Sequence, residues 1–106
     1  MSEPAEFSDA WRLARMRERE HVLSAVVLAQ MQWRDVLGLV AESIDAADAC
    51  SRLAAHFGLD EIQSHAVIDT QYRRLPTSER ARMEAELTEV RARIEELARS
   101  CRSEAE

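Results

Sequence analysis

Lysine is absent from this 106-residue chain, so all 14 of its basic residues are arginines. This absence excludes chemistry that depends on a lysine amine, such as Schiff-base formation or phosphate binding by a P-loop. The chain also has only two glycines and two prolines beside 17 alanines. A β-sandwich or barrel needs far more turn-forming residues, so we predict an all-α fold of long helices with few connections.

Other absences concern the compartment and the partners. No apolar run approaches the 18 residues of a membrane span, and the acidic N-terminus has no apolar stretch typical of a secretory signal. Cys50 and Cys101 lie far apart without C-x-x-C spacing, which favours two reduced thiols. A net charge of −6 argues against a general nucleic-acid surface. We therefore predict a cytoplasmic protein, with no membrane partner and no strong case for direct DNA binding.

Helix-start and helix-stop residues divide the chain into five predicted helices. Ser8 is a candidate N-cap for the first helix and Asp45 for the third, while Gly58 supplies a left-handed stop. Asp60 followed by Gln63 is a capping-box signal for the fourth. The predicted organisation is a flexible tail over 1–8, one helical domain over 9–101 and a second flexible tail over 102–106, the domain consisting of two arms, 9–31 and 77–101, and a head, 32–76.

The head helices carry weaker signals than the arms. The second helix, over 33–42, contains Gly38, which weakens it by roughly 1 kcal/mol relative to alanine. The fourth helix is predicted to end near Leu75, before the break at Pro76. The residues of the second helix that are predicted to point inward are Val36, Leu37, Leu39 and Val40.

The last helix carries the most specific pattern in the sequence, an unbroken heptad seam of apolar residues spaced by four and three. Such a narrow seam requires a partner helix, since one helix of this length is marginal alone in water. The first arm has matching spacing, with Glu20 at one of its positions, so we predict an antiparallel coiled coil. The seam residues are Leu13, Met16, Leu23 and Val27 in the first arm, and Met83, Leu87, Val90, Ile94, Leu97 and Cys101 in the last.

Opposite charges four residues apart flank this seam. At that spacing two side chains on a helix are neighbours, and each ion pair contributes about 0.2–0.5 kcal/mol. We therefore predict ion pairs within the last helix. They are Arg82–Glu86, Glu89–Arg93, Arg91–Glu95 and Glu95–Arg99.

Three blocks of the chain resemble a known family in that family's order. Residues 11–23, W-R-L-A-R-M-R-E-R-E-H-V-L, are similar to F-x-L-R-K-A-x-x-R-A-H-I-L of the A subunit of bacterial DNA gyrase and topoisomerase IV. Residues 57–69, F-G-L-D-E-I-Q-S-H-A-V-I-D, resemble its F-G-L-S-E-x-Q-A-x-A-I-L-D. Residues 73–80, R-R-L-P-T-S-E-R, resemble its R-R-L-T-G-L-E-R.

The resemblance implies the coiled-coil arm and terminal head of a type IIA topoisomerase. In that family two such heads meet across a two-fold axis and form the exit gate, or C-gate. The family's strand-cleaving tyrosine lies in a winged-helix domain that nothing here resembles, and Tyr72 does not match it. Pro76 stands where the family has a capping threonine. The resemblance therefore implies no enzyme activity for this chain alone.

These considerations predict a non-catalytic dimerisation module, with no catalytic residue, no cofactor and no metal site. His21, which matches a histidine at the family's arm–head junction, is expected to make a structural hydrogen bond. Two alternatives stay open: a regulator that binds gyrase A at its gate, and a helical adaptor unrelated to DNA. The homodimer interface is predicted to include Met31, Trp33, Ile68, Tyr72 and Leu75.

Overall fold

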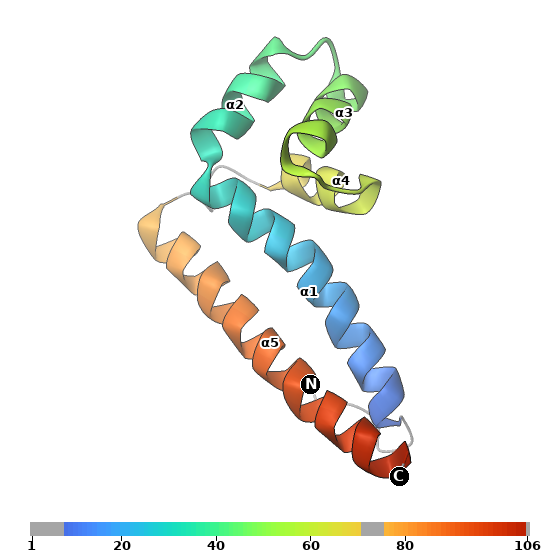
Figure 1. Ribbon diagram of the computed structural model, residues 1–106. Helices are drawn as coiled ribbons and strands as arrows, with labels where there is room; N and C mark the ends of the chain where they lie inside the picture. Colours follow the sequence, from blue (N-terminus) through green and yellow to red (C-terminus); the bar gives the residue numbers. More distant parts are fainter. Residues whose placement is uncertain (1–7, 71–75, 106) are drawn as a thin grey trace.

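The computed structural model describes residues 8–70 and 76–105, with side chains described through residue 103. These residues form five α-helices and no strand, which confirms the predicted all-α class. Two long helices lie side by side and three short helices form a head at one end of them (Figure 1). The helices are α1 (Asp9–Met31), α2 (Trp33–Glu42), α3 (Ala46–Phe57), α4 (Glu61–Asp69) and α5 (Thr77–Ala105).

The two arms, α1 and α5, run antiparallel over most of their lengths (Figure 1). Their common core contains Leu23 and Val27 from α1 and Leu87 and Val90 from α5, all less than 10% exposed. Burial of each such side chain contributes roughly 1.5–3 kcal/mol. Met16, Met83 and Ile94 pack against this cluster, Leu13 and Leu97 are buried, and Cys101 is half-buried.

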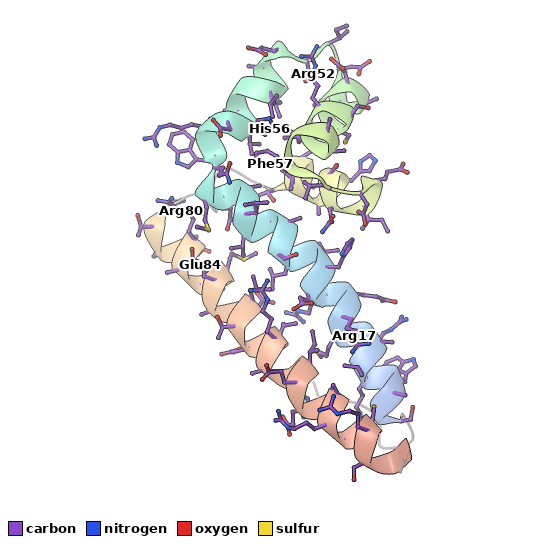
Figure 2. All side chains as sticks on the ribbon, viewed as in Figure 1. Arg17, Arg52, His56, Phe57, Arg80 and Glu84 are labelled. Atoms are coloured by element: carbon purple, nitrogen blue, oxygen red, sulfur yellow. The ribbon has the colours of Figure 1, made fainter. Side chains whose placement is uncertain are left out.

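Charged side chains cover the outside of the arms. Arg17 on α1 and Glu84 on α5 are exposed, and Arg80 lies near the start of α5 (Figure 2). At that start the carbonyl of Pro76 accepts the amide N–H of Glu79 at 3.0 Å and that of Arg80 at 3.1 Å. The backbone of the proline thus begins the helix at the position where the resembled family has a threonine side chain.

Local capping residues set most helix boundaries, as the sequence predicts. Ser8 accepts the N–H of Trp11 at the start of α1, and Asp45 accepts that of Asp48 at the start of α3. Gly58 ends α3 in the left-handed conformation, with φ 67°. These predictions are confirmed, since each depends on the chemistry of one residue and its nearest neighbours.

Two helix ends differ from the prediction. α4 ends at Asp69, six residues before Leu75, because Thr70 adopts an extended backbone and its hydroxyl donates to the carbonyl of Ala66 at 3.0 Å. The hydroxyl takes the acceptor that the Thr70 N–H would use in a continuing α-helix, and that N–H bonds the carbonyl of Val67 at 3.2 Å instead. α5 continues to Ala105, past the predicted limit of the helical domain at Cys101.

The head has its own core, centred on Leu53 of α3, which is 0% exposed. Ala25 and Ala29 of α1 and Val67 of α4 complete the buried cluster, so the end of the first arm is part of the head. Val36, Leu39 and Val40 of α2 pack against this cluster, whereas Leu37 does not. Of the four predicted inward residues of α2, Leu37 is therefore the exception.

The two glycines are expected to respond in opposite directions to alanine. Gly38 lies inside α2, and a Cβ added there meets nothing within 4 Å, so Gly38→Ala should raise the free energy of unfolding by roughly 0.5–1 kcal/mol. Gly58→Ala places a Cβ on a left-handed residue and should lower it by roughly 1–2 kcal/mol. Urea unfolding of both variants measures this; a loss of stability in Gly38→Ala would contradict the open surroundings of that position.

Candidate interaction surface and arm–head junction

Apolar side chains remain exposed where α1 meets α2. Met31, the last residue of α1, is 63% exposed, and Trp33 and Leu37 of α2 are half-buried. We call these three residues the α1–α2 face. Much of α2 is apolar, yet none of its residues is fully buried. Its apolar side chains are therefore only partly covered by the rest of the protein.

The rim of the α1–α2 face carries both charges. The guanidinium of Arg34 lies over the ring of Trp33, 4.5 Å from its centroid, in cation–π geometry. Asp35 follows directly and is exposed. Tryptophan and arginine are both enriched in protein–protein interfaces.

The remaining predicted interface residues are a head-core residue and two residues outside the described part of the chain. Ile68 of α4 is half-buried and packs against the head core. Tyr72 and Leu75 lie outside the described residues. Leu37, which was not predicted to lie on a surface, lies one turn after Trp33 on the same helix and is half-buried.

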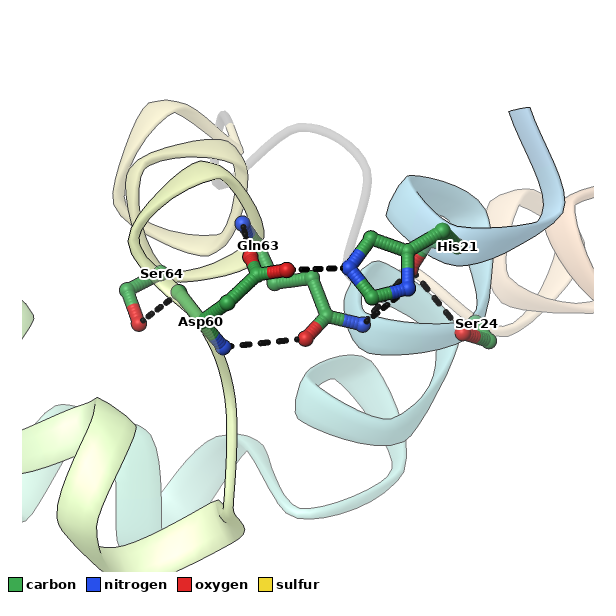
Figure 3. Close-up of polar contacts among 5 residues, drawn as sticks. All are labelled: His21, Ser24, Asp60, Gln63 and Ser64. Atoms are coloured by element: carbon green, nitrogen blue, oxygen red, sulfur yellow. Dashed lines mark hydrogen bonds and ion pairs between the residues drawn. The ribbon is translucent and has the colours of Figure 1, made fainter. Parts of the chain in front are cut away.

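The junction between arm and head is polar, and His21 is its centre on α1 (Figure 3). The ring Nε2 of His21 bonds the carboxylate of Asp60, which is the N-cap of α4. The side-chain amide of Gln63 donates to the carbonyl of His21 at 2.8 Å. The structural hydrogen bond expected of His21 is therefore confirmed.

The capping box predicted at Asp60 is present and forms the other side of this junction. The N–H of Gln63 donates to the Asp60 carboxylate at 2.8 Å, and the N–H of Asp60 donates to the Gln63 side-chain oxygen at 3.1 Å. The hydroxyl of Ser64, which is 1% exposed, donates to the carbonyl of Asp60 at 2.8 Å. These three bonds fix the first turn of α4.

Hydrogen bonds lower the pKa of three aspartates below the ordinary value of 3.8. For Asp60 the main cause is the backbone N–H of Gln63, followed by the bond from His21. For Asp48 it is the backbone N–H of Ile44, and for Asp9 the hydroxyl of Ser100. Each bond favours the ionised carboxylate, so each is linked to folding.

This linkage predicts acid sensitivity. Because the folded-state pKa values are depressed, the unfolded chain binds more protons below about pH 5, so stability is present above pH 3.8 and is lost as the pH falls through the folded values. Thermal melts between pH 6 and pH 2 should show this fall. Asp60→Asn keeps a capping oxygen without the ionisation, so its melting temperature should fall less steeply with acid; an unchanged slope would contradict a role for Asp60.

Ion pairs cross between the arms in place of the pairs predicted within α5. Arg19 of α1 pairs with Glu86, and Arg91 donates to Glu20 of α1 at 3.2 Å. The four predicted pairs at four-residue spacing are wrong for the described part of the chain. Within α5 the observed pairs have a spacing of three residues: Arg82–Glu79 and Arg93–Glu96.

The other candidate chemical groups form small contacts. The thiol of Cys50 lies 3.6 Å from Nδ1 of His65, whose Nε2 is 3.8 Å from the carboxylate of Glu61. The rings of His56 and Phe57 pack edge to face, with their centroids 4.6 Å apart. Among the residues that the structure describes, no three metal-ligating side chains converge, and none of the helices there is long and apolar enough to cross a membrane.

The fold and the site together define a class of helical module: an antiparallel pair of long helices that carries a three-helix head with an apolar face at its base. No family model matches the chain. The chain is similar to the A subunits of several bacterial DNA gyrases. It is 37% identical to the A subunit of DNA gyrase from Nocardioides sp. over 82% of its own length.

The A subunits of other gyrases give the same result. The chain is 36% identical to that of Campylobacter fetus over 89% of its length and 38% identical to that of Deinococcus deserti over 80%. These matches cover 9–11% of the relatives, so the chain spans about a tenth of their length. The similarity to a segment of gyrase A is therefore confirmed, and the chain is related to part of a type II topoisomerase.

Proposed function

We propose that the chain is a non-catalytic dimerisation module that pairs two copies through the α1–α2 face. The observation that carries the proposal is the exposure of apolar side chains there, above all Met31 at 63%. Removing such apolar surface from water lowers the free energy, so association that covers it is favoured. The resemblance to the exit gate of gyrase A supports the same kind of pairing.

The charges at the rim support a second copy as the occupant. A two-fold interface brings one surface patch against the same patch, so the patch must complement itself. Arg34 and Asp35 are adjacent and opposite in charge, so two copies can place an arginine against an aspartate on both sides of the axis. A chain with a net charge of −6 needs such local attraction, because two copies otherwise repel each other.

Sedimentation velocity over micromolar concentrations tests the pairing. We expect a dimer whose population rises with concentration. In Leu37→Gln and Met31→Gln, association should weaken by about tenfold or more, since a polar amide replaces an apolar contact. Ala55→Gln makes the same kind of change on the exposed side of α3 and should leave association unchanged. A chain that stays monomeric throughout would refute the proposal.

A second candidate follows from the relatives. A self-complementary face could also pair with the related segment of gyrase A, to which the chain is 32–38% identical. The chain would then regulate that enzyme. Pull-down of full-length gyrase A followed by a supercoiling assay tests this candidate; absence of both a mixed pair and any change in supercoiling would remove it.

A further inference from the structure

A closed ring of hydrogen bonds connects the first arm to the first turn of α4 (Figure 3). His21 bonds the carboxylate of Asp60, and Asp60 exchanges two hydrogen bonds with Gln63 at 2.8 and 3.1 Å. Gln63 returns to α1 by donating its amide to the carbonyl of His21 at 2.8 Å. The bonds that cap α4 and the bonds that attach the head to the arm thus share the same three residues.

The side-chain amide of Gln63 takes part in both the cap of α4 and the attachment to α1, so the two are coupled through one planar group. Its amide oxygen accepts from the N-cap of α4, while its amide nitrogen donates to α1. The residue is only 9% exposed, so water does not readily replace a lost partner. If the arm moves away from Asp60 and Gln63, the side chain loses the bond that orients its oxygen toward the cap.

The ring also determines which nitrogen of His21 carries the proton when the imidazole is neutral. The amide nitrogen of Gln63, which only donates, lies 3.4 Å from Nδ1, so Nδ1 must be the acceptor. The proton is then on Nε2, which donates to the carboxylate of Asp60. Each member of the ring therefore has a fixed donor or acceptor role.

We propose that His21, Asp60 and Gln63 form a latch through which the arm–head joint and the first turn of α4 open as one unit. The function of the latch rests on the proposed dimerisation, because the latch holds α4 against the second half of α1, whose last residue belongs to the α1–α2 face. His21 and Gln63 act as positioning residues. Only Gln32 separates α1 from α2, so the latched arm also fixes the start of α2.

Residue-resolved amide hydrogen exchange on the full chain tests the latch. His21→Ala changes a half-exposed side chain on α1, yet exchange of the Gln63 and Ser64 amides in α4 should rise by about tenfold. His65→Ala removes a histidine of α4 itself, whose contacts are Cys50 and Glu61, and should change these rates by less than about twofold.

A second variant separates the latch from simple capping. Gln63→Glu retains the acceptor that a capping box uses but cannot donate to the carbonyl of His21. The latch predicts faster exchange in the first turn of α4 here also, whereas capping alone predicts wild-type exchange. First-turn exchange that stays within about twofold of the wild-type rate in either variant overturns the latch.

The ring nitrogens of His21 give an independent readout. In the neutral imidazole, nitrogen NMR should find the proton on Nε2, the nitrogen that faces the carboxylate of Asp60; a proton on Nδ1 contradicts the ring. These measurements do not depend on the association state. A chain that is monomeric in sedimentation but shows coupled exchange refutes the proposed dimerisation and retains the latch, and a dimer without coupled exchange does the reverse.

Discussion

Leu53→Ala is expected to lower the free energy of unfolding by about 3 kcal/mol, within the usual range of roughly 2–5 kcal/mol for such a change. Leu53 is 0% exposed and lies at the centre of the head core, where side chains from α1, α2 and α4 surround it. Its removal leaves a cavity that the surrounding helices cannot fill without moving. Urea unfolding followed by circular dichroism measures the loss.

A neighbour on the same helix is the control for this variant. Ser51 is exposed, so Ser51→Ala should change stability by no more than about 0.5 kcal/mol. If Leu53→Ala cost no more than Ser51→Ala, the head would not be packed around α3. The expected loss would lower the melting temperature by roughly 4–8 °C for each kcal/mol in a domain of this size.

Leu87→Ala is expected to cost about 2–3 kcal/mol by disrupting the contact between the arms. Leu87 is 6% exposed and belongs to the cluster with Leu23, Val27 and Val90. An arm helix without its partner is marginal in water, so loss of this contact should also reduce the helical signal of the folded baseline. Thermal and urea unfolding at one fixed chain concentration measure both effects.

Glu89→Ala is the matched control on α5. Glu89 is exposed and has no ion pair among the described residues, so alanine should change the free energy of unfolding by less than about 0.5 kcal/mol. Equal effects of Leu87→Ala and Glu89→Ala would mean that the apolar seam does not hold the arms together.

The parts of the fold that follow from nearby residues could be predicted from the sequence. The cap at Ser8, the left-handed stop at Gly58 and the capping box at Asp60 all depend on chemistry within a single helical turn. The all-α class followed from composition, since the chain has only two glycines and two prolines. The resemblance to gyrase A could be identified because three blocks kept their order.

The parts that depend on distant contacts could not be predicted. Arg91 pairs with Glu20 of the other arm and not with Glu95. Predicting this pair requires the rotation of each arm about its own axis, whereas heptad spacing identifies only the apolar faces that meet. The early end of α4 depends on the backbone of Thr70. For the site, the sequence indicated His21 and Gln63 individually, but only the packing of α4 on α1 joins them.

The one-residue connection between α1 and α2 has a mechanical consequence. Gln32 donates its N–H to the carbonyl of Leu28, while its own carbonyl accepts the N–H groups of Asp35 and Val36 at 3.1 Å. The hydrogen-bond ladder of the arm thus passes into α2 without a loop between them. Because Gln32 is bonded to both helices, a displacement of the end of α1 displaces the start of α2 with it.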